Sequence, residues 1–182
     1  MNEGLIPRRY AKALFKTATE RGLSQRLYSL MQTLAAAFDS NSGIAAVVNN
    51  PYVDLADKTR IISTAAGATD SDTLFADFLK LLAQNHRIGM TGDIAHAFVA
   101  EYRHDNNISR VLLTSAAPLP SEVVDRIKKL IDNHLPEGAK MEFDTAVDPD
   151  LLGGFIVTID NQRLDASVRN SLRDLRLQLL KK

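Results

Sequence analysis

Residues 148–160, DPDLLGGFIVTID, are the most sharply specified passage of this 182-residue chain. A proline-led turn opens the passage, and two leucines and two glycines follow it. Phe155, Val157 and Ile159 then alternate with a more polar set of residues, which predicts a strand with one fully apolar face. We expect the paired glycines to mark a bulge or a close approach of backbone at the start of this strand.

A phosphate-binding loop is the alternative explanation of Gly153 and Gly154. Such a loop places its glycines between a strand and the N-terminus of a helix, whose free N–H groups hold the anion. Here the glycines precede a strand, and neither GK[ST] nor GxGxxG follows them. The sequence therefore favours a structural role for this pair.

The residues after the strand predict a final helix. Residues 160–163 form a polar turn in this prediction, and the helix begins at Leu164. Its apolar residues recur at intervals of three and four, at Val168, Leu172, Leu175 and Leu179. Arginines lie between them, at positions 163, 169, 173 and 176. This spacing is typical of a helix with a narrow apolar seam.

The composition excludes several classes of protein. Lys+Arg and Asp+Glu both total 22, and each side of the Asn107–Ile108 bond contains 11 basic and 11 acidic residues. A sequence-independent nucleic-acid binder needs clustered cationic charge, so we expect no nucleic-acid partner. The lack of cysteine excludes disulfides, thiolate zinc sites and a cysteine nucleophile. The sequence shows no apolar run of about 18 residues and no signal or transit pattern. We expect a soluble intracellular protein without direct membrane insertion.

Residues 1–107 predict an all-α bundle, because six helices with short connections are expected there and no strand pattern interrupts them. The expected helices cover residues 5–21, 24–38, 44–48, 54–65, 70–84 and 88–102. The character of the sequence changes at Ile108. Residues 108–182 predict a small α/β module in the order β-α-β-β-α, with strands at 111–116, 141–147 and 155–159 and helices at 122–134 and at the C-terminus. The predicted fold is mainly α: a six-helix bundle, then an α/β module with a long C-terminal helix.

Two helices of the predicted bundle carry more apolar surface than one packed face requires. In the first helix, Tyr10 and Ala13 lie beside a core face and broaden it. The fifth helix is apolar over more than half of its circumference. Either this surface packs inside the bundle, or a groove between the two helices accepts an amphipathic helix of a partner. The residues alone leave both alternatives open.

No motif predicts catalysis, a cofactor or a metal site. The four histidines are scattered, and two of them share a predicted helix at a spacing of two turns rather than one. Paired carboxylates occur at turns and helix starts, where capping accounts for them: Asp70 with Asp72, and Asp148 with Asp150. No serine lies in a nucleophile-elbow context. The sequence therefore indicates a binding protein rather than an enzyme.

Three passages resemble the delta subunit of bacterial F-type ATP synthases, a family similar to the mitochondrial oligomycin-sensitivity-conferring subunit. They are residues 9–15 (RYAKALF); residues 81–88 (LLAQNHRI) with 114–119 (TSAAPL); and residues 150–157 (DLLGGFIV) with 164–169 (LDASVR) and Leu172. The resemblance covers essentially the whole chain. It departs from the family at His86, where glycine is common, so it does not specify the geometry of that turn.

The resemblance implies a non-catalytic stator subunit without a cofactor. In the family, the N-terminal domain binds the N-terminal helix of an alpha subunit on top of the catalytic head. The C-terminal part joins the b subunits of the peripheral stalk. Together they keep the head from turning with the rotor, so that torque drives ATP synthesis. The implied location is the cytoplasmic face of the bacterial inner membrane, as a peripheral part of the complex.

The resemblance also implies which residues bind each partner. The alpha-subunit contacts lie between the first and fifth helices, at Tyr10, Ala13, Leu14, Phe78 and Leu81. The b-subunit contacts are expected at Phe155, Val168, Leu172 and Leu175. The alternative function is a helical adaptor or RNA-associated regulatory protein. That alternative would require the basic face that this chain lacks.

Overall fold

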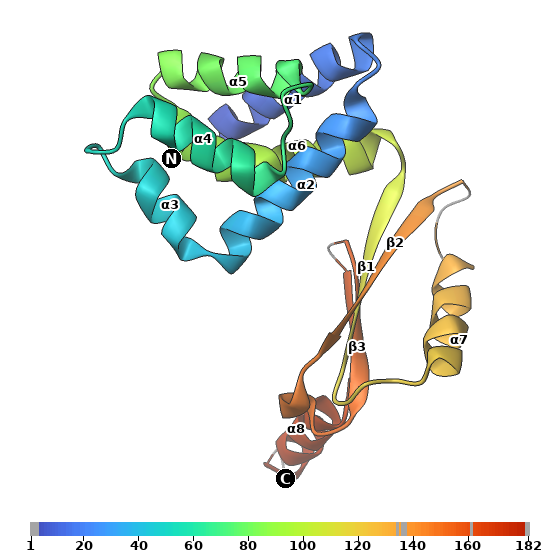
Figure 1. Cartoon of the computed structure of the whole chain (residues 1–182). Helices are drawn as coiled ribbons and strands as arrows, with labels where there is room; N and C mark the ends of the chain where they lie inside the picture. The colour runs from blue at the N-terminus through green and yellow to red at the C-terminus, as the bar shows by residue number, and fades with distance from the viewer. Residues whose placement is uncertain (1–3, 134, 136–137, 161, 181–182) are drawn as a thin grey trace. The chain divides into compact units, whose positions relative to one another are not determined.

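The computed structural model describes residues 4–133, 135, 138–160 and 162–180, and for residues 174, 175 and 178–180 it describes the backbone alone. The chain divides into two compact units, Met1–Arg103 and His104–Lys182 (Figure 1). The boundary expected at residue 107 lies just beyond this division. Each unit contains its own cluster of buried apolar residues, so each is described separately.

The first unit is built from helices with short connections. In chain order they are α1 (Leu5–Glu20), α2 (Ser24–Ser40), α3 (Ser42–Asn49), α4 (Leu55–Ala66), α5 (Thr73–Gln84), the 3-10 helix η1 (Ile88–Met90) and α6 (Thr91–Asp105). The core contains fully buried residues from α2, α4, α5 and α6, including Met31, Ile62, Phe75 and Phe98. Within the described residues of this unit, the secondary structure is entirely helical.

Aromatic contacts join three helices of this core. Phe15 of α1 makes edge-to-face contacts with Phe98 and Tyr102 of α6, at ring-centroid distances of 6.0 and 6.2 Å. Tyr102 stacks on Tyr28 of α2 at 4.1 Å. Such pairs add to the stabilisation that burial of the rings provides. Part of the surplus apolar surface of α1 is therefore core.

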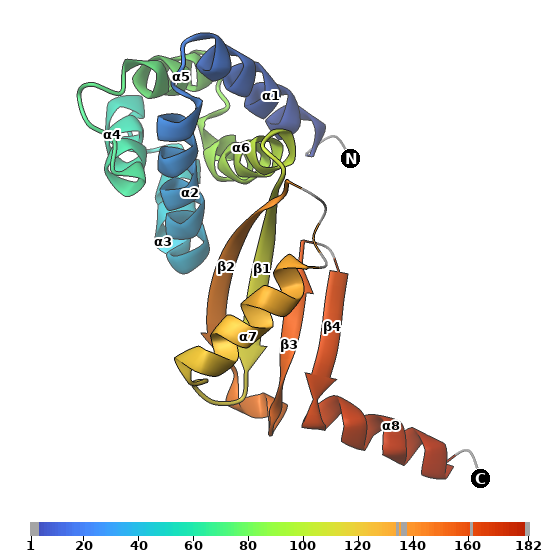
Figure 2. The same ribbon diagram turned by 90° about the vertical axis from the view of Figure 1, so that its right-hand side faces the viewer.

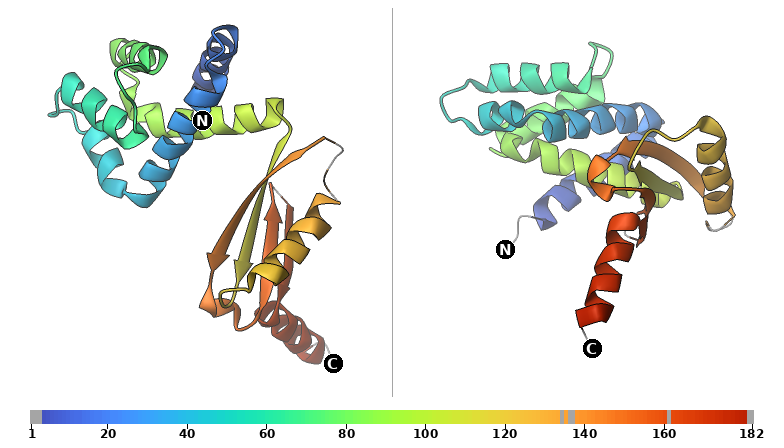
Figure 3. Two further views of the ribbon diagram at one scale, coloured as in Figure 1. Left: turned by 45° about the vertical axis from the view of Figure 1, so that its right-hand side comes forward. Right: turned by 90° about the horizontal axis from the view of Figure 1, so that it is seen from below.

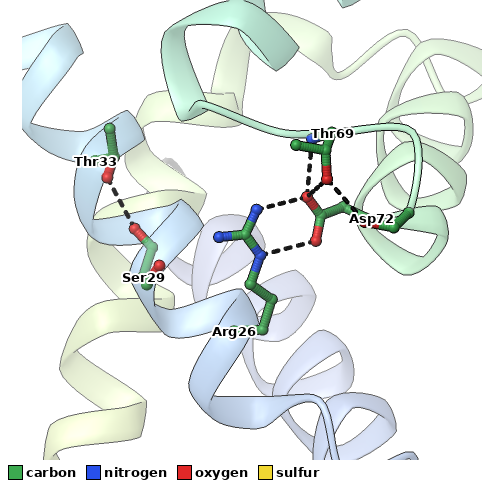
Figure 4. Close-up of polar contacts among 6 residues, drawn as sticks. Arg26, Ser29, Thr33, Thr69 and Asp72 are labelled. Carbon is green, nitrogen blue, oxygen red and sulfur yellow. Dashed lines mark hydrogen bonds and ion pairs between the residues drawn. The ribbon is translucent and has the colours of Figure 1, made fainter.

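An ion pair attaches the start of α5 to α2 (Figure 4). The Arg26 guanidinium donates two hydrogen bonds to the Asp72 carboxylate, at 2.9 and 2.8 Å. The same carboxylate accepts the backbone N–H and the hydroxyl of Thr69, at 2.8 and 2.9 Å. The expected capping role of Asp72 is wrong, because its side chain makes no capping bond to α5. The capping role of Asp148 is confirmed: it accepts the N–H of Asp150 at 3.0 Å.

The second unit contains a four-stranded mixed sheet. Its elements are β1 (Ile108–Ser115), α7 (Ser121–Asp132), β2 (Lys140–Val147), the 3-10 helix η2 (Pro149–Leu151), β3 (Gly154–Ile159), β4 (Gln162–Ser167) and α8 (Val168–Leu180). The strand order is β2-β1-β3-β4. Strands β1 and β2 are parallel, and the other two pairs are antiparallel. Helix α7 forms the crossover between β1 and β2 and lies across one face of the sheet (Figure 2).

The predicted order β-α-β-β-α is wrong in one element, because residues 162–167 form strand β4. The spacing of Leu164 and Val168 suggested that the helix begins at Leu164, yet Leu164 pairs with Val157 across the β3–β4 hairpin. Helix α8 begins only at Val168, where the hydroxyl of Ser167 accepts the N–H of Asn170 at 3.2 Å. Antiparallel pairing at the sheet edge therefore overrides the helical spacing.

Gly154 is the point of close backbone approach that the sequence predicts. It has φ +74°, and a Cβ at this position would collide with the carbonyl oxygen of Ala166. It pairs with Ser167, the last residue of β4. The expectation of a close approach is therefore confirmed, and no side chain fits at this position without movement of the backbone.

Substitution of Asp72 by asparagine tests the ion pair. The hydrogen bonds from Arg26 and then from Thr69 lower the pKa of Asp72 below its ordinary value of 3.8. A lowered pKa stabilises the fold above the ordinary value, and this contribution disappears as the pH falls through the pKa of the folded state. We expect Asp72→Asn to lower the Tm by several degrees at pH 7 and the difference to shrink below pH 3.8. Asp70→Asn, at a neighbouring exposed carboxylate, is the matched control for thermal unfolding by circular dichroism.

Gly154→Ala tests the close approach. We expect this change to lower the free energy of unfolding by about 3 kcal/mol, because strain at positive φ adds to a backbone collision. Gly138→Ala separates the two causes, since Gly138 has φ +81° and open space around its Cα. Gly138→Ala should lower the free energy of unfolding by only about 1 kcal/mol. Equal losses in urea unfolding would show that the collision contributes nothing.

Candidate partner-binding surfaces

The C-terminal end of α5 brings an arginine to α1. His86 has φ +55°, and the N–H of Arg87 donates to the carbonyl of Leu82 at 2.8 Å. This is the left-handed termination that usually favours glycine, here formed by histidine. The turn directs Arg87 to Tyr10: its guanidinium donates to the phenol oxygen at 3.1 Å and lies 5.5 Å from the ring centroid. Tyr10 is thereby held against the end of α5.

The five residues expected to contact an alpha subunit fall into three groups. Leu14 and Phe78 are 5% and 6% exposed and belong to the hydrophobic core. Tyr10 is half-buried and packs against that core. Ala13 is exposed on α1, and Leu81 is 46% exposed on α5. Ala13 and Leu81 are therefore the members of this set whose apolar side chains are exposed to solvent.

The sheet of the second unit is wider than its covering helix. Four strands span about 14 Å between the outer strand axes, whereas one helix is about 10 Å wide. Helix α7 buries Ile127 and Ile131 against β1 and β3, and Lys128 lies 4.9 Å from the ring centroid of Phe143 on β2. Strand β4 is left at the uncovered edge (Figure 2).

A groove of about 920 Å³ lies along this uncovered part of the sheet. Apolar residues of α7 form one side, and residues of β3, β4 and the hairpin between them form the other. Its lining is Ser109, Ile127, Leu130, Ile131, Leu135, Phe155, Val157, Ile159, Asp160, Gln162, Arg163 and Leu164. Leu130 and Leu164 are exposed on its two sides. The groove therefore offers apolar surface of the kind that binds a helix or another elongated apolar group.

The two charged residues that line this groove have structural partners. The Asp160 carboxylate accepts the backbone N–H of Arg110 at 2.9 Å. The Arg163 guanidinium pairs with Asp165 at 3.2 Å. Hydrogen bonds from Ser167 and then from Arg163 lower the pKa of Asp165. The same carboxylate accepts the hydroxyl of Ser167, the residue that caps α8. Arg163 and Asp165 therefore organise the β4–α8 junction, whereas Asp160 joins the β3–β4 turn to β1.

The b-subunit candidates lie on both sides of that junction. Phe155 lines the groove and pairs across the hairpin with Ala166, two residues before Val168. Val168 and Leu172 are exposed on α8. The side chain of Leu175 lies outside the described residues. Helix α8 extends away from the sheet (Figures 2 and 3), and Val168 and Leu172 of its seam are 44% and 53% exposed.

The sequence reasoning missed Arg87, Leu130 and Leu164. Arg87 stands in a turn, and its contact with Tyr10 depends on the left-handed His86. Leu164 had a detectable signal, since Leu164 and Ala166 alternate with polar residues as in an edge strand. Leu130 had no signal in the sequence, because its exposure depends on the width of the sheet relative to α7.

The histidines and carboxylates of the described residues do not form a metal-binding group of three or more. His96 instead contacts Asp39 at 3.1 Å, which joins α6 to the end of α2. Exposed apolar side chains on α1, α5, α8 and the groove are the features that stand out from the surface. Contiguous apolar surface of this kind is typical of sites that bind other proteins.

Comparisons with known proteins identify the family. The sequence profile described as "ATP synthase delta (OSCP) subunit" matches residues 6–179. The ATP synthase subunit delta of Bacteroides thetaiotaomicron is 36% identical, covering 100% of this chain and 97% of that protein. That of Erythrobacter litoralis is 34% identical, covering 92% and 90%. A chain of the Toxoplasma gondii mitochondrial ATP synthase hexamer, solved by cryo-EM, matches with a TM-score of 0.67 and 26% identity over 96% of this chain and 97% of that one. The chain belongs to the ATP synthase delta (OSCP) subunit family.

Members of this family are non-catalytic structural subunits, and this chain is a stator component of the peripheral stalk of an F-type ATP synthase. The resemblance noted in the sequence is therefore confirmed, and the adaptor or RNA-associated alternative is not favoured. Among the described residues, the structure contains no helix with the length and apolar character needed to cross a membrane.

Unfolding measurements can distinguish the buried from the exposed candidates for alpha-subunit binding. We expect Phe78→Ala to lower the free energy of unfolding by about 3–5 kcal/mol, because it leaves a cavity in a packed core. Leu81→Ala, three residues further along the same helix, should change it by about 0.5 kcal/mol or less. Urea unfolding followed by circular dichroism gives both values. A large loss from Leu81→Ala would contradict the exposure that the structure assigns to it.

Proposed function

We propose that this chain connects the N-terminal helix of an ATP synthase alpha subunit to the b subunits of the peripheral stalk. The observation that supports this role is the presence of two compact units, each with exposed apolar surface of its own. In this proposal residues 1–107, which contain the first unit, serve as a six-helix bundle that holds the alpha subunit. Residues 108–182 hold the stalk. A link of this kind resists rotation of the catalytic head, so that rotor torque is used for ATP synthesis.

The proposed alpha-subunit surface is centred on Ala13 and Leu81. Ala13 gives a partner helix room for close approach, and Leu81 supplies a large apolar side chain. Tyr10 borders this surface and is held in place by Arg87. Leu14 and Phe78 support the two helices from inside the core.

The proposed b-subunit surface has two parts. The first is the groove that contains Phe155, where apolar residues of α7 and β3 face an uncovered region of the sheet. The second is the apolar seam of α8, which contains Val168, Leu172 and Leu175. The structure describes the side chains of Val168 and Leu172. A helix of the stalk in the groove would complete the layer that α7 begins.

The proposed location is the cytoplasmic face of the bacterial inner membrane, where the complex holds the chain by protein contacts. The proposal includes no cofactor and no nucleic-acid partner. The balanced charge of the chain, with 22 basic and 22 acidic residues, agrees with binding through apolar surfaces.

Titration of the full chain with a synthetic peptide of the cognate alpha-subunit N-terminal helix tests the first surface. We expect one-to-one binding in calorimetry, weakened by about tenfold or more in Ala13→Asp and in Leu81→Asp, because each change places a charge against apolar groups. For Tyr10→Asp we expect the same loss of binding with the fold retained. The contact with Arg87 means that this variant also removes a bond within the unit.

Ala36→Asp is the matched control, because it places the same charge at an exposed alanine on α2. It should bind the peptide as the unchanged chain does. Circular dichroism should show near-native helicity for all three exposed-site variants. Unweakened binding in Ala13→Asp and Leu81→Asp would place the interface elsewhere, and absence of binding by the unchanged chain would contradict the proposed alpha-subunit role.

A further inference from the structure

Helix α8 carries an uneven distribution of charge. Its sequence, VRNSLRDLRLQLL, contains three arginines and one aspartate. Arg169, Arg173 and Arg176 are all exposed. Arg173 donates to Asn170 at 2.6 Å. Within the described part of the chain, the side chains of Arg169 and Arg176 form no hydrogen bond or ion pair.

These arginines lie along one side of the apolar seam. At 100° per residue, Arg169 and Arg176 fall directly beside the line through Val168 and Leu172. The opposite side of the seam carries uncharged Ser171. If Val168 and Leu172 occupy the core positions of a two-stranded coiled coil, Arg169 and Arg176 occupy flanking positions, where interhelical ion pairs form.

The helix is poorly supported by its own unit. Its 13 residues span about 20 Å, and a helix of this length is marginally stable in water without packing. The elements against which it packs are η2 and β4, near its first turn. Further along, Leu172 is 53% exposed and Leu177 is exposed as well. A partner helix would therefore stabilise α8 as well as bind it.

The positive charge beside the seam of α8 favours a partner with negative charge. A second copy of α8 would bring the arginines together in an antiparallel pair and would set them opposite uncharged Ser171 in a parallel pair, so it offers them no ionic partner in either orientation. A helix with carboxylates at the positions that flank its own apolar seam would pair with Arg169 and Arg176. We propose that α8 binds an acidic amphipathic helix with a leucine-type seam, and that this helix is a segment of the peripheral-stalk partner. This inference rests on the proposed function and specifies the chemistry of one of its contacts.

The test uses the full chain and two designed peptides of three heptads each. Both peptides have leucine at the core positions. One has glutamate at the flanking positions, and the other has lysine there. We expect the glutamate peptide to bind about tenfold more tightly than the lysine peptide at low salt, and the difference to shrink at 0.5 M salt. Fluorescence anisotropy of labelled peptides gives both affinities.

The double variant Arg169→Glu/Arg176→Glu should reverse the preference and favour the lysine peptide. Arg126→Glu/Lys129→Glu makes the same change of charge on exposed residues of α7 and should leave the preference unaltered. Equal binding of both peptides to the unchanged chain would overturn the proposal. Binding to vesicles of equal parts phosphatidylglycerol and phosphatidylcholine, without binding of the glutamate peptide, would also overturn it in favour of a membrane surface.

The cognate b subunit, without its membrane segment, separates this inference from the proposed function. Binding that Arg169→Glu/Arg176→Glu weakens by about tenfold, while Arg126→Glu/Lys129→Glu does not, supports both. Binding that neither variant changes overturns the inference about α8 and leaves the stalk contact standing. Absence of b-subunit binding by the unchanged chain contradicts the proposed stalk contact itself.

Discussion

The close backbone contact at Gly154 is the constraint on which the second unit depends. Because this residue has no side chain, β4 lies against the start of β3, with Ser167 opposite Gly154. That pairing places Ser167 where its hydroxyl caps α8. It also places Leu164 at the uncovered edge of the sheet, beside the groove. The position of Leu164 beside the groove and the start of α8 therefore both depend on the β3–β4 pairing that Gly154 permits.

In the first unit, polar contacts hold both ends of α5 against other helices. Arg26 holds the start of α5 on α2, and Arg87 links the end of α5 to Tyr10 of α1. With both ends held, the buried side of α5 is fixed by Phe78 and its neighbours, and Leu81 is left outside. Exposed apolar surface on a helix that is fixed at both ends needs little rearrangement when a partner binds, which reduces the entropic cost of association.

The sequence predicts most helices and strands because their apolar residues recur at clear helical or strand spacing. Where the prediction is wrong, the cause is physical. Leu164 and Val168 have helical spacing, but the pairing of Leu164 with Val157 places the first of them in a strand. The apolar residues of α1 and α5 identify helices with surplus surface, yet periodicity does not distinguish buried Leu14 from exposed Ala13. That distinction depends on which helices pack on each side, as does the contact of Arg87 with Tyr10.

A stator subunit carries load between two partners, so its two contacts act in series and the weaker one limits the connection. The proposed surfaces lie on separate compact units of one chain, which divide between Arg103 and His104, near the end of α6. Once the first partner is bound, the second surface is presented to the assembly at a high effective concentration. Each contact can then be of moderate strength while the assembly holds. Apolar surfaces that are modest in size and flanked by charge, like that of α8, suit such a role because charge specifies the partner and multiplicity supplies the strength.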